Sequence, residues 1–499
     1  MKLNIRKKIK NLLEPGEGLQ QRTIRSGGWA FALRVVEQAF GLIRLGVLAR
    51  ILMPGDFGLL GIALLTMAAL QTFSQTGFHA ALVQKKQDTE KYLDAAWTVS
   101  ALRGLVLFTI LLLAAPLAAS FFDAPEATPI IRVIAITALL QGLTNVGVIY
   151  FQKELEFKKQ FIYIAAGTFA DVAVAVSAAL ILRNVWALVF GLLAGAVVRL
   201  IVSYVIQPYR PRPRFDLAQA RELFGFGKWI LAITILLFLI GQGDDIFVGK
   251  VLGITLLGLY QMAYQISSKP ATEITAVISA VAFPAYSKVQ DSLPSLREGF
   301  LKALQLTAFI SFPLAGGIFV VAPEFTKLLL GDHWLPMVSA MQVLALWGLM
   351  GSIGGTMGPL FMAVGRPDIP TKISVLRLLV LGALIYPLSM EWGIAGTAWA
   401  VAISACLTVP ISYHILMKSI LKSSGRYFAR VALLIPFIGA GLMVLLLSFF
   451  TKEGASSLQF ALEVLGGAAF YFAVTYGLDR LLKYGLRDNL RVVILGGLR

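Results

Sequence analysis

The sequence predicts an all-α polytopic membrane protein with about 14 transmembrane helices, arranged as two pseudo-symmetric six-helix lobes around a central cavity plus two C-terminal helices. Three observations lead to this prediction. Hydrophobic residues make up 58% of the 499 residues and charged residues only 14%, whereas a soluble domain has about 25% charged residues. Long apolar runs recur along the whole chain. Lys and Arg gather in alternate connections between these runs, as they do in membrane proteins.

Each predicted transmembrane helix is an apolar run long enough to cross about 30 Å of hydrocarbon. The connections are short, and none has room for a catalytic domain. The predicted spans are 27–47, 57–83, 94–120, 129–151, 162–182, 185–206, 223–246, 254–283, 300–323, 335–363, 371–389, 393–417, 428–450 and 458–480.

The distribution of basic residues predicts the orientation of these spans. One set of alternate connections, together with both ends of the chain, carries most of the Lys and Arg residues. Because basic connections stay on the cytoplasmic side, we expect both termini to be cytoplasmic. The net charge of +17 then reflects topology rather than nucleic-acid binding, since no soluble basic module is present. The opposite set of connections offers only Arg50, Arg183, Lys250, Lys327 and Lys452.

The N-terminal segment 1–26 is basic and precedes an apolar run of about 20 residues without a small-residue cleavage site, so we interpret that run as an uncleaved first span. The segment itself is either an amphipathic helix on the anionic leaflet or a frayed basic tail. The single Cys406 forms no intrachain disulfide, and the three histidines are scattered. We therefore expect no metal site and no cofactor.

An internal repeat supports two lobes. Shifting the sequence by 200 residues aligns 44–60 with 244–260 and pairs Arg50 with Lys250, although chance resemblance between apolar segments is an alternative. An even number of spans per repeat relates the lobes by an axis along the membrane normal. The predicted organisation is a basic cytoplasmic segment 1–26, an N-lobe 27–206, a basic cytoplasmic linker 207–222, a C-lobe 223–417, two further spans within 428–480 and a cytoplasmic tail 481–499.

Seven short phrases carry a resemblance to a known family. They are LARILMPGDFGLLGIA (48–63), FGFGKW (224–229), DDIFVGKVLGITLLGLYQMAYQISSKPA (244–271), FPAYSKVQDS (283–292), LLGDHW (329–334), AVGRPDIPTKI (363–373) and WGIAGTAWAVAIS (392–404). In this order they resemble the polysaccharide transporter, or oligosaccharide flippase, branch of the multidrug/oligosaccharidyl-lipid/polysaccharide (MOP) exporter superfamily. The resemblance covers nearly the whole chain. It implies a two-lobed fold in the bacterial cytoplasmic (inner) membrane. It also implies translocation of undecaprenyl-pyrophosphate-linked sugar repeats from the inner to the outer leaflet, for cell-surface or exopolysaccharide synthesis.

Charged residues inside the spans are the candidate substrate ligands, because each costs about 2.5 to 3.5 kcal/mol at the bilayer centre on insertion scales. Arg34, Lys269 and Arg377 are candidate ligands for phosphate or for acidic sugars, and Arg suits phosphate through its planar fork. Gln71 and Gln75 lie four residues apart on the second span and are candidate glycan ligands in the same cavity. No catalytic residue is predicted.

Three acidic residues in the spans are candidates for ion coupling or for charge pairs. Glu37 lies three residues after Arg34, so the two form either part of the cavity or a structural pair. Glu273 and Lys269 are four residues apart and either act on substrate or neutralise each other. Asp171 is either a proton or cation coupling site or an inter-helix hydrogen-bonding group.

Other polar or small residues in the spans have simpler expected roles. Arg103 and Arg199 are expected to reach toward the cytoplasmic interface. The glycines of GLLAG (191–195) are expected to mark close helix packing.

Two adjacent carboxylates, Asp244 and Asp245, end one of the most hydrophobic runs. The 200-residue repeat aligns Asp244 with Arg44, and a two-fold axis along the membrane normal would place both at one depth. We therefore predict an outer gate in which Arg44 pairs with Asp244 or Asp245 when the outer side is closed. The alternative is that Lys250 neutralises Asp245 without any gating role.

The first functional hypothesis is a lipid-linked oligosaccharide flippase that is not an enzyme and works by alternating access. Its expected partners are the undecaprenyl-pyrophosphate-linked glycan, the lipid bilayer, H⁺ or Na⁺ as coupling ion, and other polysaccharide-assembly proteins, with no nucleic acid. One alternative is a cation-coupled multidrug exporter of the same superfamily, in which acidic residues should dominate the cavity. Another is a membrane-embedded polysaccharide polymerase or ligase, which should carry a long outer loop.

Overall fold

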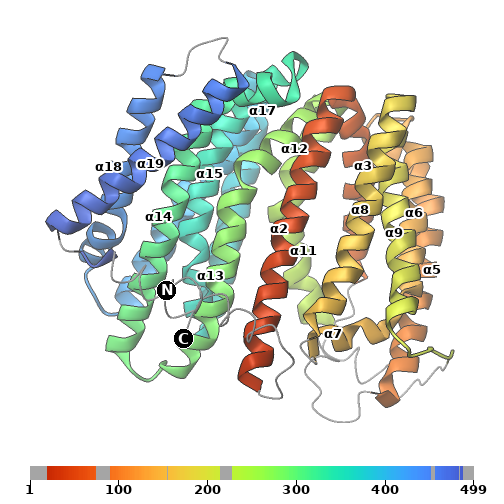
Figure 1. The fold of residues 1–499 in the computed structure, drawn as a ribbon, viewed down its shortest axis with the longest axis horizontal. Helices are drawn as coiled ribbons and strands as arrows, with labels where there is room; N and C mark the ends of the chain where they lie inside the picture. The colour runs from red at the N-terminus through yellow and green to blue at the C-terminus, as the bar shows by residue number, and fades with distance from the viewer. Residues whose placement is uncertain are drawn as a thin grey trace, which may run out of the picture. The chain divides into compact units, whose positions relative to one another are not determined.

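The computed structural model describes residues 19–74, 90–153, 156–213, 227–450, 456–482 and 484–486. Within these ranges the regular structure is entirely helical (Figure 1). The predicted segment 1–26, the linker 207–222 and the tail 481–499 lie largely outside the described residues. Contacts divide the chain into two compact units, the described parts of Met1–Ile235 and of Leu236–Arg499.

The first unit is a bundle of mostly long helices. The strongest packing is between neighbours in sequence, α8 with α9 and α5 with α6, and α2 returns to pack on α8. Its elements are α2 (Leu19–Ile51), α3 (Pro54–Phe73), α5 (Glu90–Phe121), α6 (Ala127–Leu143), the 3₁₀ turn η1 (Val146–Val148), α7 (Ile149–Lys153), α8 (Phe157–Leu182), α9 (Trp186–Ile206) and the beginning of α11 (Gly227–Phe247).

The second unit contains the end of α11 and the remaining helices. Here α14 packs against α15 and α18, while α15 packs against α17. The elements are η2 (Val248–Leu252), α12 (Ile254–Ser267), α13 (Lys269–Lys288), α14 (Leu293–Phe325), η3 (Thr326–Leu330), η4 (Asp332–Met337), α15 (Val338–Gly355), α16 (Met357–Ala363), α17 (Asp368–Ile415), η5 (Leu416–Ile420), α18 (Gly425–Phe450) and α19 (Ser457–Leu482).

In the described ranges, each predicted span lies on one helix, on two or three consecutive helical elements, or on one arm of α17. Residues 75–83 of the span 57–83 and residues 223–226 of the span 223–246 lie outside these ranges. By length and composition, nine helical segments in the described ranges are apolar enough to cross a membrane, and Ala127–Leu143 is a shorter apolar helix. The all-α polytopic fold class is therefore confirmed, while the count of 14 spans stays a prediction. The predicted span 254–283 is two helices, and the break falls at Ser268, just before Pro270 in the first turn of α13.

The long helix α17 turns back on itself at Trp392 and Gly393, where the backbone leaves helical geometry. Gly393 has φ +56° and ψ −136°, a conformation that favours glycine. Residues eight apart in a straight helix are separated by about 12 Å along its axis. Here the hydroxyls of Ser389 and Thr397 lie 2.7 Å apart, and a Cβ atom on Gly396 would be 1.8 Å from the Leu388 carbonyl oxygen. The turn separates the predicted spans 371–389 and 393–417.

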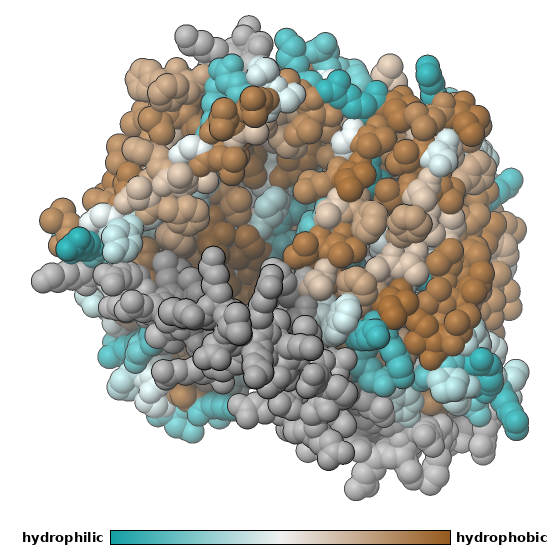
Figure 2. Space-filling model, viewed as in Figure 1, coloured by the Kyte–Doolittle hydropathy of each residue, from teal (hydrophilic) through white to brown (hydrophobic). Residues whose placement is uncertain are grey.

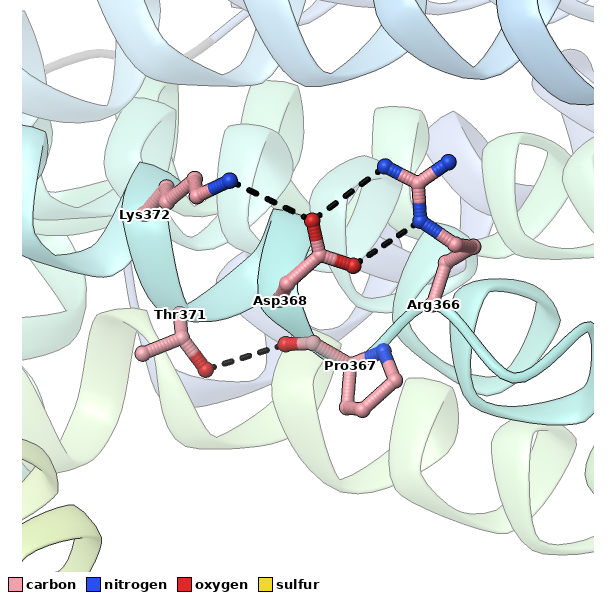
Figure 3. A network of polar contacts seen from close by, with 5 residues as sticks. All are labelled: Arg366, Pro367, Asp368, Thr371 and Lys372. Carbon is pink, nitrogen blue, oxygen red and sulfur yellow. Dashed lines mark hydrogen bonds and ion pairs between the residues drawn. The ribbon is translucent and has the colours of Figure 1, made fainter.

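A network of exposed polar contacts marks the beginning of α17 (Figure 3). The guanidinium of Arg366 donates to both carboxylate oxygens of Asp368, at 2.9 and 3.2 Å, and Lys372 donates to one of them at 3.3 Å. The Thr371 hydroxyl donates to the Pro367 carbonyl at 3.0 Å. An aspartate in the first turn also complements the helix dipole. This network fixes where α17 begins, and Arg377 follows on the same helix.

Glycines allow close packing inside the first unit. A Cβ atom on Gly191 of α9 would lie 2.6 Å from both Ala175 Cβ and Asp171 Oδ1 of α8. Likewise, Gly104 of α5 and Gly142 of α6 meet backbone to backbone, since a Cβ atom on either would lie 2.9 Å from the Cα atom of the other. Small residues at these crossings are typical of membrane helix packing, as the GLLAG segment predicted.

The segment after α9 is held against the first unit by Asp94 and Asn145. The Tyr209 hydroxyl donates to the Asp94 carboxylate, and the Arg212 backbone N–H donates to the same oxygen at 2.9 Å. The Asn145 side chain donates to the Tyr209 carbonyl at 2.7 Å. Burial raises the pKa of Tyr209, and the bond to Asp94 raises it further. Tyr209 is therefore a neutral donor at physiological pH.

The helix flanks expose large apolar side chains. Figure 2 shows hydrophobic residues over much of the visible helix surface, with hydrophilic residues gathered mainly toward the helix ends. Examples are Leu117 on α5, Ile181 on α8 and Phe449 on α18, which are 72%, 81% and 77% exposed. Such surfaces are stable in contact with lipid rather than with water.

Candidate functional site

A buried acidic pair lies at the end of α11 in the second unit. The Asp244 side chain is 3% exposed and accepts a 2.7 Å hydrogen bond from the Tyr260 hydroxyl of α12. Its neighbour Asp245 faces Gln261, and its Oδ1 atom is buried without a hydrogen-bond partner among the described residues. Carboxylates are costly in an apolar helix bundle, so these two residues form a candidate functional site.

Arg377 provides the positive charge near this acidic pair. It lies on α17, and Asp244 attracts it electrostatically. The guanidinium is placed over the Trp347 ring of α15, with its central carbon 5.6 Å from the ring centroid, and Trp347 packs on Tyr264 at 5.0 Å. The cation–π contact holds the planar Arg377 guanidinium against the Trp347 ring. The guanidinium N–H groups can donate to phosphate or carboxylate oxygens.

The first unit has a comparable charge cluster. Arg44 of α2 and Asp171 of α8 form an ion pair, with 3.4 Å between Arg44 Nε and Asp171 Oδ1. The two side chains are 25% and 14% exposed. Arg199 of α9 also attracts Asp171, and Gly167 of α8 leaves the space that the Arg199 side chain occupies. Within the described part of the chain, Arg44 Nε, Arg44 Nη2 and Asp171 Oδ1 are buried without hydrogen-bond partners, so the pair keeps hydrogen-bonding capacity.

A third polar group surrounds a cavity of about 200 Å³ between α3, α5 and α6. The Gln71 side chain donates to Gln141 at 3.4 Å. Arg103 donates to the Ser74 hydroxyl at 3.0 Å and to the Gln71 carbonyl at 3.2 Å. The half-buried Arg103 side chain thus binds the last turn of α3. Its expected reach toward the cytoplasmic interface stays a prediction.

The remaining predicted ligands lie apart from these clusters. Arg34 is exposed on α2, and Glu37 is partly exposed one turn later. Lys269 is exposed at the beginning of α13, and Glu273 is partly buried on the same helix. Gln75 lies outside the described residues. The roles of these residues in substrate binding or coupling stay predictions.

The predicted gate residues have partners within their own units. Arg44 pairs with Asp171, and Asp244 is bonded to Tyr260. Lys250, the alternative partner of Asp245, is exposed on η2. An outer gate between Arg44 and Asp244 stays a prediction, and its formation would require Arg44 to release Asp171.

Several site residues were not found from the sequence. Tyr260, Trp347 and Gln141 are single polar or aromatic residues in apolar helices, without a charge or a spacing that marks them. Tyr260 follows Asp244 by 16 residues, beyond the break at Gly253 between η2 and α12. Only the turn at Gly253, which packs α12 against η2, brings the two together.

The chain was compared with known proteins. A sequence profile of the family described as "Polysaccharide biosynthesis protein" matches residues 47–339. The chain is 28% identical over 422 residues to the lipopolysaccharide biosynthesis protein WzxC of Escherichia coli K12, covering 84% of this chain and 85% of WzxC. It is 27% identical over 414 residues to the teichuronic acid biosynthesis protein TuaB of Bacillus subtilis 168, covering 79% and 83% of the two chains.

The fold is also similar to that of a solved transporter. The lipid II flippase MurJ, in an inward closed conformation, aligns with a TM-score of 0.72 and 15% identity, covering 92% of this chain and 99% of that one. This likeness shows a shared fold. The profile match covers more than half of the sequence, so the chain belongs to the polysaccharide biosynthesis protein family.

Proposed function

We propose that this protein is a flippase that moves undecaprenyl-pyrophosphate-linked oligosaccharide repeat units from the inner to the outer leaflet of the bacterial cytoplasmic membrane, for cell-surface or exopolysaccharide synthesis. The observation that carries the proposal is that partly buried arginines lie near carboxylates inside apolar helices: Arg44 forms an ion pair with Asp171, and Asp244 attracts Arg377 electrostatically. The names of the relatives and the fold shared with a flippase support it.

The substrate chemistry fits these residues. A pyrophosphate needs cations, and a guanidinium stacked on Trp347 offers N–H groups in a fixed plane. Sugar hydroxyls need acceptors and donors, which Asp245 and Gln71 supply. The isoprenoid tail needs an apolar surface. A cavity of about 340 Å³ between α14, α18 and α19, lined by side chains such as Phe309, Met443 and Tyr471, provides one.

The ion pair of the first unit suggests a mechanism of alternating access. When the outer side closes, Arg44 exchanges Asp171 for Asp244 or Asp245, and the exchange links substrate movement to gate closure. Asp171 then loses its nearest cation. A carboxylate left in an apolar region is costly, so Asp171 would take up H⁺ or Na⁺ at that step. Both chain termini would lie on the cytoplasmic side, as the basic residues predict, and other polysaccharide-assembly proteins would be partners.

Two other functions make different demands on the chain. A cation-coupled multidrug exporter needs a cavity dominated by acidic residues, whereas each buried cluster described above includes an arginine. A polymerase or ligase needs an outer loop with catalytic residues, and the predicted outer connections are short. Both observations favour the flippase.

A flipping assay tests the proposal. Purified protein is reconstituted into proteoliposomes that contain a fluorescent lipid-pyrophosphoryl oligosaccharide, and accessibility of the fluorophore to a quencher reports its leaflet. We expect protein-dependent exchange that Arg377→Gln slows, while Arg430→Gln, an exposed arginine on α18, leaves it unchanged. Efflux of cationic drugs together with no movement of any lipid-linked glycan would refute the proposal.

A further inference from the structure

A basic pocket lies where α17 and η5 meet the beginning of α18. Its volume is about 750 Å³, and its lining includes Lys418, Lys422, Arg426 and His414. The described residues that line this pocket include no acidic side chain. Like charges gathered in this way repel one another unless an anion joins them.

The pocket wall is held in place by specific contacts. Arg297 of α14 donates to the carbonyls of Leu421 and Lys422 at 2.7 and 2.6 Å. Lys422 itself has φ +45°, an uncommon conformation for a residue with a side chain. The Tyr413 hydroxyl donates to the Gly425 carbonyl at 2.8 Å and ties the loop to α17. These contacts cap the end of η5 and hold the pocket wall in one conformation.

An apolar stripe leads to this pocket along α17. Leu407, Ile411 and His414 of α17 are spaced 4 and 3 residues apart, so they share one face of the helix. Lys418 follows four residues later, in the π-helical turn η5. Leu407 and Ile411 are 51% and 41% exposed, and His414 and Lys418 are exposed and polar or basic. The face therefore changes from apolar to basic toward the end of the helix.

This order of side chains matches the order of groups in a phospholipid, with acyl chains at one end and a phosphate at the other. Basic pockets between membrane helices bind the head groups of anionic lipids. Tyr427, which is 58% exposed in the first turn of α18, is the kind of amphipathic ring found at the level of lipid head groups. We propose that this pocket is a binding site for the phosphate head group of an anionic phospholipid whose acyl chains lie along Leu407 and Ile411.

The simplest alternative is that these cations only set topology. In that case any Lys or Arg at the same membrane surface is equivalent, and the pocket shape is irrelevant. The two interpretations differ in whether lipid retention depends on which cations are removed.

Native mass spectrometry of the full-length protein tests this difference. The protein is purified in detergent and titrated with phosphatidylglycerol or phosphatidylcholine. The pocket variant is Lys418→Gln/Lys422→Gln/Arg426→Gln. The matched control, Lys158→Gln/Arg212→Gln/Lys288→Gln, removes the same charge from exposed sites that the sequence also predicts to be cytoplasmic. All six positions are exposed, so we expect both proteins to fold.

We expect the wild type and the control to retain phosphatidylglycerol in preference to phosphatidylcholine. The pocket variant should bind phosphatidylglycerol about fivefold more weakly for each cation removed, or about 100-fold in all. Equal weakening in the two triple variants, or equal retention of the two lipids by the wild type, would overturn the proposal. If inorganic phosphate binds the pocket as tightly as phosphatidylglycerol does, the proposal that the ligand is a lipid is refuted. None of these measurements depends on the flipping activity proposed above.

Discussion

The ion pair between Arg44 and Asp171 allows a quantitative test of how the first unit is stabilised. Asp171→Asn keeps the side-chain size but removes the charge that Arg44 Nε meets at 3.4 Å. Removing one partner of a buried pair costs about 3–5 kcal/mol. The two side chains keep 25% and 14% exposure, and their contact lacks hydrogen-bond geometry. We therefore expect the free energy of unfolding to fall by less, about 2 kcal/mol.

Thermal unfolding in detergent measures this loss. For a unit of this size, about 2 kcal/mol corresponds to a decrease in Tm of about 4–8 °C. The control is Asp368→Asn, which removes the exposed carboxylate of the Arg366 ion pair. Exposed ion pairs contribute little to stability, so this variant should have a far smaller shift. The double variant Arg44→Gln/Asp171→Asn should lose less unfolding free energy than the two single variants lose together, because it leaves neither partner of the pair charged and unpaired.

Two results would refute this reasoning. One is a Tm of Asp171→Asn that decreases no more than that of Asp368→Asn. The other is a double variant whose loss equals the sum of the two single losses, since strict additivity would mean that Arg44 and Asp171 do not interact.

Three further changes test the packing and the second cluster. Tyr260→Phe removes the hydroxyl that donates to the buried Asp244 carboxylate. The free energy of unfolding should fall by about 1–3 kcal/mol, measured by thermal unfolding. An unchanged Tm would contradict the hydrogen bond. Arg377→Lys keeps the charge but loses the planar contact with Trp347. If that contact contributes about 1.4 kcal/mol to the transition state, the flipping rate should be about tenfold lower. An unaltered rate would show that the charge alone suffices. Gly191→Val should lower the Tm more than Gly191→Ala, because the larger side chain fits less well at the α8–α9 crossing. Equal Tm values for the two variants would argue against close packing there.

The helices were predictable because each is a long apolar run, and the bilayer sets its minimum length. Their breaks were predictable only in part. The second arm of α17 is predicted to begin at Gly393, and the structure turns sharply at Trp392 and Gly393. In contrast, the break at Ser268 falls inside one predicted span, because the apolar character of the sequence continues across it. Hydropathy reports burial in lipid but not the direction of the helix axis.

The charge clusters were only half predictable. Each of Arg44, Asp171, Asp244 and Arg377 stands out as a charge in an apolar span, so the sequence identified them singly. Their partners depend on which helix faces meet, and spacing along one helix does not determine that. Arg44 and Asp171 lie on the first and the fifth predicted spans, yet the packing of α2 on α8 joins them.

The turn at Trp392 and Gly393 has a consequence for how the chain enters the membrane. A straight helix of 48 residues would be about 72 Å long, more than twice the hydrocarbon thickness. Because α17 doubles back, its two ends would emerge on one side of the bilayer, as the basic residues at both ends also predict. Its two arms would be inserted together as one helical hairpin during synthesis. The only part of α17 that must be carried across the bilayer is then the short polar apex around Glu391.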